Sequence, residues 1–91
     1  MRKVRMNVQG RVQGVGFRYM TKMVADELEI KGTVRNEDDG SVSIEAIGTD
    51  EAMTLFIQKV KESPSPMGRV TYVDIQEYPL MEVYKKFSVT N

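Results

Sequence analysis

The stretch GRVQGVGFR at residues 10–18 separates a strand-like segment from a helix-like segment, and it contains three of the chain's seven glycines. Glycines at this density give up side-chain packing and raise the entropy cost of folding. Arg18 then places a cation at the start of a helix, where the helix dipole opposes it. Both costs are explained if the turn binds an anion, because a glycine-rich turn can direct several backbone N–H groups into one concavity.

The spacing of these residues leaves two interpretations equally open. In the first, Gly14 and Gly16 adopt positive φ, and Arg18 grips a phosphate bidentately beside the free N–H groups of the helix. The backbone groups that would cradle the phosphate are those of Gln13, Gly14, Val15, Gly16, Phe17 and Arg18. In the second, the glycines make only a sharp connection and the arginine is solvated. No nucleotide is predicted, since the stretch lacks both a Walker GK[ST] and a complete GxGxxG.

The hydrophobic pattern on both sides of this stretch predicts alternating strands and helices. Alternation over residues 4–8 is typical of a half-buried strand. Helical spacing from Phe17 to Leu28 predicts the first helix, with Gly32 as the residue that closes it. The remaining expected elements are strands over 33–36, 41–47 and 70–75, a second helix from an N-cap at Thr49 to near Glu62, and a short edge strand over 87–89.

The resulting order, β-α-β-β-α-β plus a tail, is that of the ferredoxin-like split βαβ fold. We therefore expect an α+β protein with an antiparallel sheet and both helices on one face, forming a single domain over residues 1–91. This fold hosts many unrelated functions, so the function has to be argued from the residues of a site.

Composition narrows the chemistry further. The 91 residues are 41% hydrophobic and 29% charged with zero net charge, which is typical of a globular domain and gives no support to binding nucleic acid or a membrane surface. The lack of cysteine excludes disulfides, and the lack of histidine excludes imidazole catalysis and His/Cys zinc sites. With no signal-peptide pattern and no long apolar run, we expect a cytoplasmic protein, and with no long apolar surface stripe, a monomer.

Two motifs extend the pattern around the glycine-rich stretch. The first is Val8-x-Gly10-x-Val12-Gln13-Gly14-Val15-x-Phe17-Arg18, and the second is Gly32-x-Val34-Arg35-Asn36 followed by Gly40-x-Val42 and Gly48. In this order they resemble the signatures of the acylphosphatases, small enzymes that hydrolyse acyl phosphates. The resemblance covers nearly the whole chain, including the Ser-Pro break at 63–66. One departure is Thr33, where the family usually has an aromatic residue, which puts the packing beside Asn36 and the substrate preference in question.

The resemblance implies a βαββαβ fold without metal or cofactor, a small acyl phosphate as substrate and inorganic phosphate as product. It also implies that Arg18 binds the phosphoryl group and that Asn36 positions the attacking water. This chemistry suits a chain without histidine, because the leaving carboxylate has a pKa of only about 4 and needs no general acid. The remaining requirements are stabilisation of the phosphoryl charge and orientation of an in-line water.

Other functions have less support from the residues. Asn36 could simply cap the turn that follows it, and the acidic run at 37–39 is more typical of a solvated turn than of a metal site. An RNA-binding module of this fold needs aromatic residues on its central strands, and SVSIEAIG at 41–48 has none. The main alternative is a non-catalytic domain that senses anions through the glycine-rich stretch, which would have no need of Asn36.

Overall fold

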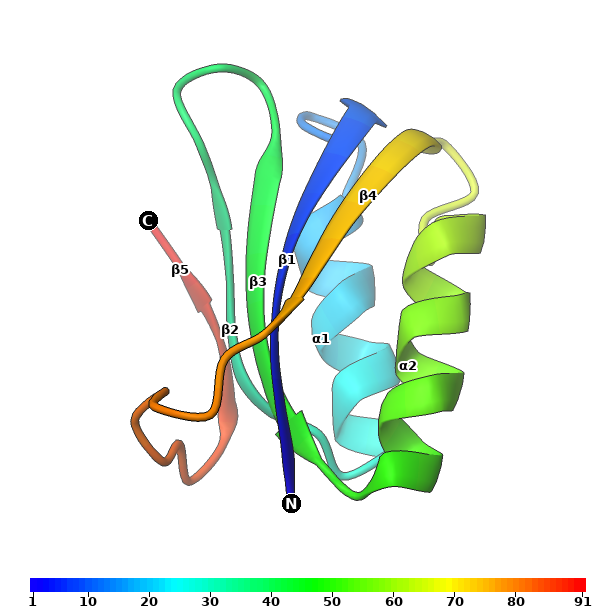
Figure 1. The fold of residues 1–91 in the computed structure, drawn as a ribbon. Helices are drawn as coiled ribbons and strands as arrows, with labels where there is room; N and C mark the ends of the chain where they lie inside the picture. The colour runs from blue at the N-terminus through cyan, green and yellow to red at the C-terminus, as the bar shows by residue number, and fades with distance from the viewer.

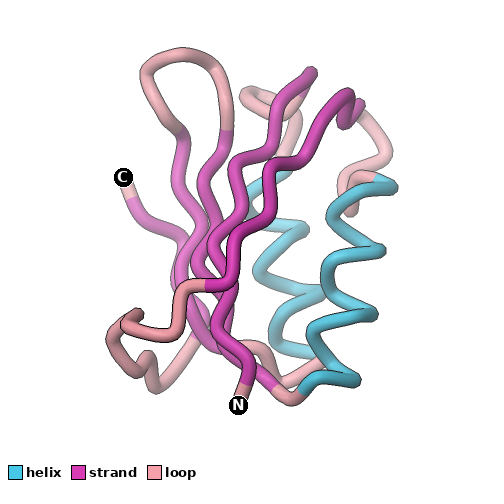
Figure 2. The backbone as a smooth tube through the Cα atoms, in the orientation of Figure 1, coloured by secondary structure: helices cyan, strands magenta, loops and turns pink.

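The computed structural model describes all residues from 1 to 91 and contains two helices and five strands (Figure 1). In chain order the elements are β1 (Arg2–Arg11), α1 (Phe17–Glu27), β2 (Lys31–Asn36), β3 (Val42–Gly48), α2 (Asp50–Glu62), β4 (Arg69–Glu77) and β5 (Phe87–Thr90). The strands form one sheet in the order β4-β1-β3-β2-β5, and both helices cover one face of it (Figure 2). The expected ferredoxin-like α+β fold is confirmed.

The sheet is antiparallel except at one edge. β1 pairs antiparallel with β3 and with β4, and β2 pairs antiparallel with β3. β5 instead runs parallel to β2, with Gly32 opposite Phe87 and Arg35 opposite Thr90. The sheet is therefore mixed rather than wholly antiparallel, and the parallel pairing places the carboxyl ends of β2 and β5 side by side.

Alternating residues of the two central strands form the core beneath the helices. The buried members are Val4, Met6 and Val8 of β1 and Val42, Ile44 and Ala46 of β3. The rings of Phe56 and Phe87 meet edge to face at 6.0 Å between the helices and the sheet. Phe17, the first residue of α1, is 1% exposed and belongs to the same core. Burial of such a ring stabilises the fold by about 1.5–3 kcal/mol. The buried Phe17 side chain therefore holds the first residue of α1 against the sheet.

The first helix ends earlier than the sequence pattern predicts. α1 stops at Glu27, and Glu29 then takes a positive φ of 56°. Gly32 does not close the helix but lies inside β2, where an added Cβ would collide with the main-chain oxygen of Glu45 in β3. The expectation that Gly32 ends α1 is wrong, because the close approach of two strands, and not a helix terminus, requires glycine there.

Three connections lie together at one end of the sheet (Figure 1). They are the β1–α1 loop at residues 12–16, the β2–β3 turn at residues 37–41 and the α2–β4 loop at residues 63–68. The carboxyl end of β5 points toward the same end of the molecule (Figure 1). Neither helix has the length and apolar character that a membrane span requires.

Candidate active site

The β1–α1 loop has the backbone conformation that the sequence predicts for an anion cradle. Gly14 and Gly16 take φ values of 73° and 76°, in the left-handed region that glycine adopts without penalty. Gly16 precedes α1 without any side-chain cap, and the first turn of α1 contains no acidic residue. In α2, by contrast, Thr49 accepts a hydrogen bond from the N–H of Ala52, and acidic residues occupy the first turn. The N-terminus of α1 therefore has neither a side-chain cap nor a nearby carboxylate, whereas the N-terminus of α2 has both.

The backbone donors of this loop are free. The N–H of Met20 donates to Gly16 O at 3.0 Å, but none of the backbone N–H groups of residues 13–19 donates a hydrogen bond within the chain. Consecutive free N–H groups at a helix N-terminus attract negative charge, both as donors and through the helix dipole. The loop can therefore bind an anion without breaking any hydrogen bond of the protein.

Side chains from both neighbouring connections hold the loop in place. Gln13 Nε2 donates to Glu37 O at 2.8 Å and to Ser41 O at 2.9 Å in the β2–β3 turn. On the other side, the hydroxyl of Ser65 in the α2–β4 loop donates to Val15 O at 2.6 Å. These bonds engage a side chain and a carbonyl of the loop, so the loop is anchored while its N–H groups stay available.

Arg18 lies in the first turn of α1, and one nitrogen of its guanidinium group donates hydrogen bonds to the end of β5. Its Nη1 donates to Thr90 O and to Asn91 O, each at 3.1 Å. Its Nε and Nη2 have no partner in the chain, and the guanidinium takes part in none of the ion pairs. One nitrogen of a half-buried cation is thus fixed by main-chain oxygens, and the edge formed by Nε and Nη2 is free for a bidentate contact with an anion.

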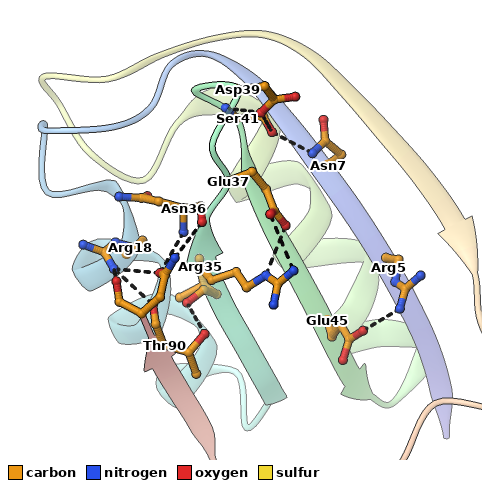
Figure 3. A network of polar contacts seen from close by, with 12 residues as sticks. Arg5, Asn7, Arg18, Arg35, Asn36, Glu37, Asp39, Ser41, Glu45 and Thr90 are labelled. Atoms are coloured by element: carbon orange, nitrogen blue, oxygen red, sulfur yellow. Dashed lines mark hydrogen bonds and ion pairs between the residues drawn. The ribbon is translucent and has the colours of Figure 1, made fainter.

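Asn36 ends β2 beside Arg18, and Asn91 connects the two residues (Figure 3). The side chain of Asn91 donates to Asn36 O at 2.8 Å and accepts from the Asn36 N–H at 3.2 Å. The same Asn91 oxygen lies 3.4 Å from Arg18 Nη1. The side-chain oxygen of Asn36 is buried and accepts no hydrogen bond. The structure therefore places the two residues expected to act together in one cluster, with one polar atom left unpartnered.

Thr33 faces away from this cluster. Side chains alternate along a strand, so Thr33 and Arg35 lie on the sheet face opposite to the helices. There they line a groove of about 590 Å³ together with Glu45 and Tyr84. Burial and a hydrogen bond to Glu45 raise the pKa of Tyr84 to about 12. The position that departs from the family pattern thus contributes to this open face and not to the packing of the Asn36 side chain.

The acidic run of the β2–β3 turn is engaged within the protein. Glu37 pairs with Arg35 at 3.1 Å, and a carboxylate oxygen of Asp39 accepts from both the N–H and the hydroxyl of Ser41. These hydrogen bonds hold the pKa of Asp39 below its ordinary value. The chain has no group of three or more His, Cys, Asp or Glu residues that could hold a metal ion. The turn's carboxylates organise the turn itself.

Several residues of the cluster were not expected from the sequence. The Gln13 side chain connects the loop to the β2–β3 turn, and Ser65 donates to the loop. At the end of β5, Thr90 and Asn91 accept hydrogen bonds from Arg18. In the sequence, Ser65 belongs to a segment that ends a helix, and nothing there indicates that it contacts the β1–α1 loop. Asn91 takes a φ of 45°, a region that asparagine tolerates better than most residues, but nothing in the sequence marks it as a partner of Arg18. Its hydrogen bonds to Arg18 and Asn36 depend on the tertiary fold.

The fold and the cluster define a class, a ferredoxin-like α+β protein with a run of free backbone N–H groups at its first βα connection. A sequence model of the acylphosphatase family matches residues 4–89. An acylphosphatase of Enterococcus faecalis is 71% identical over 98% of both chains, and one of Lactobacillus johnsonii is 51% identical over the same share. The crystal structure of acylphosphatase from Bacillus subtilis covers 100% of both chains with a TM-score of 0.95 and 42% identity. The chain belongs to the acylphosphatase family and is accordingly a hydrolase.

Proposed function

We propose that the chain hydrolyses small acyl phosphates at the β1–α1 loop, releasing a carboxylate and inorganic phosphate. The observation that carries the proposal is the run of free N–H groups at residues 13–19, next to an arginine that pairs with no Asp or Glu side chain. Membership of the acylphosphatase family supports the same reaction. No metal or cofactor takes part in the steps below.

The substrate phosphoryl group binds in the loop. Its oxygens accept hydrogen bonds from the backbone N–H groups of residues 13–18, and Arg18 adds Nε and Nη2. Negative charge spreads over the equatorial oxygens as the P–O bond to the leaving group breaks, and donors fixed in advance stabilise that charge most in the transition state. The anchoring of Arg18 by Thr90 and Asn91 supports this role, because the guanidinium is already oriented.

Asn36 orients the attacking water. Its side-chain amide, which carries an oxygen acceptor and an NH₂ donor, positions the water, which attacks phosphorus opposite the leaving carboxylate. The water proton passes to a phosphoryl oxygen, and the carboxylate leaves with the electron pair of the P–O bond. Since the conjugate acid of the leaving group has a pKa of about 4, it departs without protonation. Atoms and charges balance without a protein acid or base.

The test is release of inorganic phosphate from benzoyl phosphate in the presence of EDTA. We expect Arg18→Ala to lower kcat/KM about a thousandfold or more and to abolish phosphate binding. Asn36→Ala should lose turnover but keep phosphate binding, because it leaves the loop intact. Arg35→Ala is the control, since Arg35 is the neighbour of Asn36 on the opposite face and is paired with Glu37.

Two outcomes would contradict the proposal. A wild-type rate in Arg18→Ala would mean that the loop is not the site. A wild-type protein that binds phosphate without turnover would instead be the non-catalytic anion sensor. The monomeric state and the cytoplasmic location stay predictions, and sedimentation of the purified protein measures the first.

A further inference from the structure

We propose that Ser65 is a positioning residue for this reaction, and that its hydroxyl holds the peptide between Val15 and Gly16 so that the Gly16 N–H faces the bound phosphoryl group. The inference rests on the proposed function and adds to it a residue from a separate part of the chain. Ser65 lies in the α2–β4 loop, which Figure 1 shows at the same end of the sheet as the β1–α1 loop.

Ser65 is buried and is held by several hydrogen bonds. Its side chain is buried, with only 2% of the residue exposed. Its hydroxyl donates to Val15 O at 2.6 Å, joining residues 50 positions apart, and accepts from the Met67 N–H at 3.3 Å. The Ser65 carbonyl accepts from the Ser63 hydroxyl at 2.8 Å and from the Gly68 N–H at 3.0 Å. Both the backbone and the side chain of Ser65 are therefore held before any ligand binds.

Peptide geometry connects this bond to the cradle. In a trans peptide the C=O of one residue and the N–H of the next point in opposite directions. A hydroxyl that fixes Val15 O on the side of the α2–β4 loop therefore also fixes the Gly16 N–H on the other side. Gly16 is one of the free donors at the start of α1. Ser65 thus sets the direction of a donor that it does not touch.

The peptide needs such a support because its neighbours do not restrain it. Gly14 and Gly16 flank Val15, and a Cβ added at either would meet nothing within 4 Å. Rotation of the peptide changes ψ of Val15 and φ of Gly16, and glycine allows a wide range of φ. A rotated peptide would aim the Val15 carbonyl oxygen at the phosphoryl oxygens in place of an N–H. The hydrogen bond from the Gly16 N–H would then be replaced by repulsion between the Val15 carbonyl oxygen and the phosphoryl oxygens.

A nucleophilic role for Ser65 does not fit the same contacts. Its hydroxyl proton is directed at Val15 O, and the chain has no histidine that could accept it. Val15 O is in turn a main-chain acceptor that takes no part in chemistry. The hydroxyl therefore acts through the loop and not on the substrate.

The experiment compares Ser65→Ala with Ser63→Ala. Ser63 is the matched control, because it lies in the same loop and donates its hydroxyl to the Ser65 carbonyl at 2.8 Å, but forms no hydrogen bond with the β1–α1 loop, so Ser63→Ala leaves the bond between the Ser65 hydroxyl and Val15 O in place. The readouts are thermal unfolding, kcat and KM for benzoyl phosphate, and the amide proton shift of Gly16 during titration with inorganic phosphate. We expect both variants to lose similar stability. Only Ser65→Ala should lower kcat/KM, by about tenfold or more, as expected for loss of about one hydrogen bond to the phosphoryl group.

The Gly16 amide shift separates positioning from general destabilisation. In the wild type and in Ser63→Ala, phosphate should move the Gly16 signal downfield, and in Ser65→Ala that shift should be reduced. An undiminished shift with wild-type kcat/KM in Ser65→Ala would overturn the inference, as would an equal activity loss in Ser63→Ala. If Ser65→Ala does not fold, Ser65→Cys keeps the volume with a weak donor, and wild-type kcat/KM there overturns the inference too. Absence of any phosphate shift in the wild type would instead refute the proposed site.

Discussion

Two connections at the same end of the sheet, the β1–α1 loop and the β2–β3 turn, both contain glycine in the left-handed region but differ in how they use their backbone donors. Both contain glycines with positive φ, Gly14 and Gly16 in the loop and Gly40 in the turn, and all three have open space where a side chain would be. In the turn, the N–H groups of Glu37 and Gly40 donate to carbonyls within the turn at 2.8 and 3.2 Å. In the loop, the N–H groups have no partner.

The difference separates the proposed binding loop from a turn that only connects two strands. Glycine content and positive φ are common to both, so neither feature identifies a site. The feature that differs is the run of consecutive donors at residues 13–19, which ends in the first turn of α1 and has no partner in the chain. The turn satisfies three of its own donors, those of Glu37, Gly40 and Ser41, while the loop is anchored through a carbonyl and a side chain and none of its donors at residues 13–16 has a partner in the chain.

The strongest test exchanges one glycine in each connection for alanine. Gly16→Ala and Gly40→Ala should each cost about 1–2 kcal/mol of stability, because an L-residue is strained in the left-handed region. Gly16→Ala should also lower kcat/KM for benzoyl phosphate about a hundredfold, which is the usual effect of displacing an oxyanion donor. Gly40→Ala should leave kcat/KM unchanged. Equal activity in the two variants would remove the distinction between loop and turn.

A smaller effect is expected at the residue that joins the two connections. Gln13→Ala removes both hydrogen bonds to the β2–β3 turn, which should cost about 1–2 kcal/mol in chemical denaturation. Loosening of the loop should lower kcat/KM about tenfold, because small displacements of a cradle reduce catalysis. Gln58→Ala serves as control, since Gln58 donates only to Glu62 on the surface of α2. Full activity in Gln13→Ala would show that the turn does not support the loop.

The smallest effect is expected inside the turn. Asp39→Asn weakens the hydrogen bonds that Ser41 donates to Asp39, so the melting temperature should fall at neutral pH while kcat/KM stays unchanged. The pKa of Asp39 is lowered in the folded protein, so its contribution to stability is complete above the ordinary pKa of about 4. That contribution is lost as the pH falls through the lower folded value. Melting curves of both proteins across this range should therefore converge in acid.

The sequence predicted those parts of the molecule that depend on local patterns. Alternation of Val4, Met6 and Val8 and the N-cap at Thr49 predicted elements that the structure contains, because burial and capping act over a few residues. Gly32 was misassigned, since a glycine after a helical pattern and a glycine between close strands have the same local signature.

The site was predictable only in part for the same reason. Gly14, Gly16 and Arg18 lie close together in the chain, so their spacing gave an anion site as one of two open interpretations, and the family resemblance implied the proposed role of Arg18. The supports of the loop do not lie close in the chain, because Ser65 meets Val15 across 50 positions and Arg18 meets Thr90 across 72. Contacts at such separations depend on how helices and sheet pack, and no periodicity in one segment encodes them.

The direction of β5 has a consequence for the order of folding. Because β5 is parallel to β2, its last residues reach Asn36 and Arg18 only after nearly the entire chain has been wound into place. Bringing together residues that are far apart in the chain costs conformational entropy before the contacts between them can form. We therefore expect the pairing of β5 with β2 to form late. The hydrophobic core can therefore be present while the arginine is still unanchored. We therefore expect the anchoring of Arg18 by the end of β5 to form late in folding, and fraying of β5 to release the guanidinium.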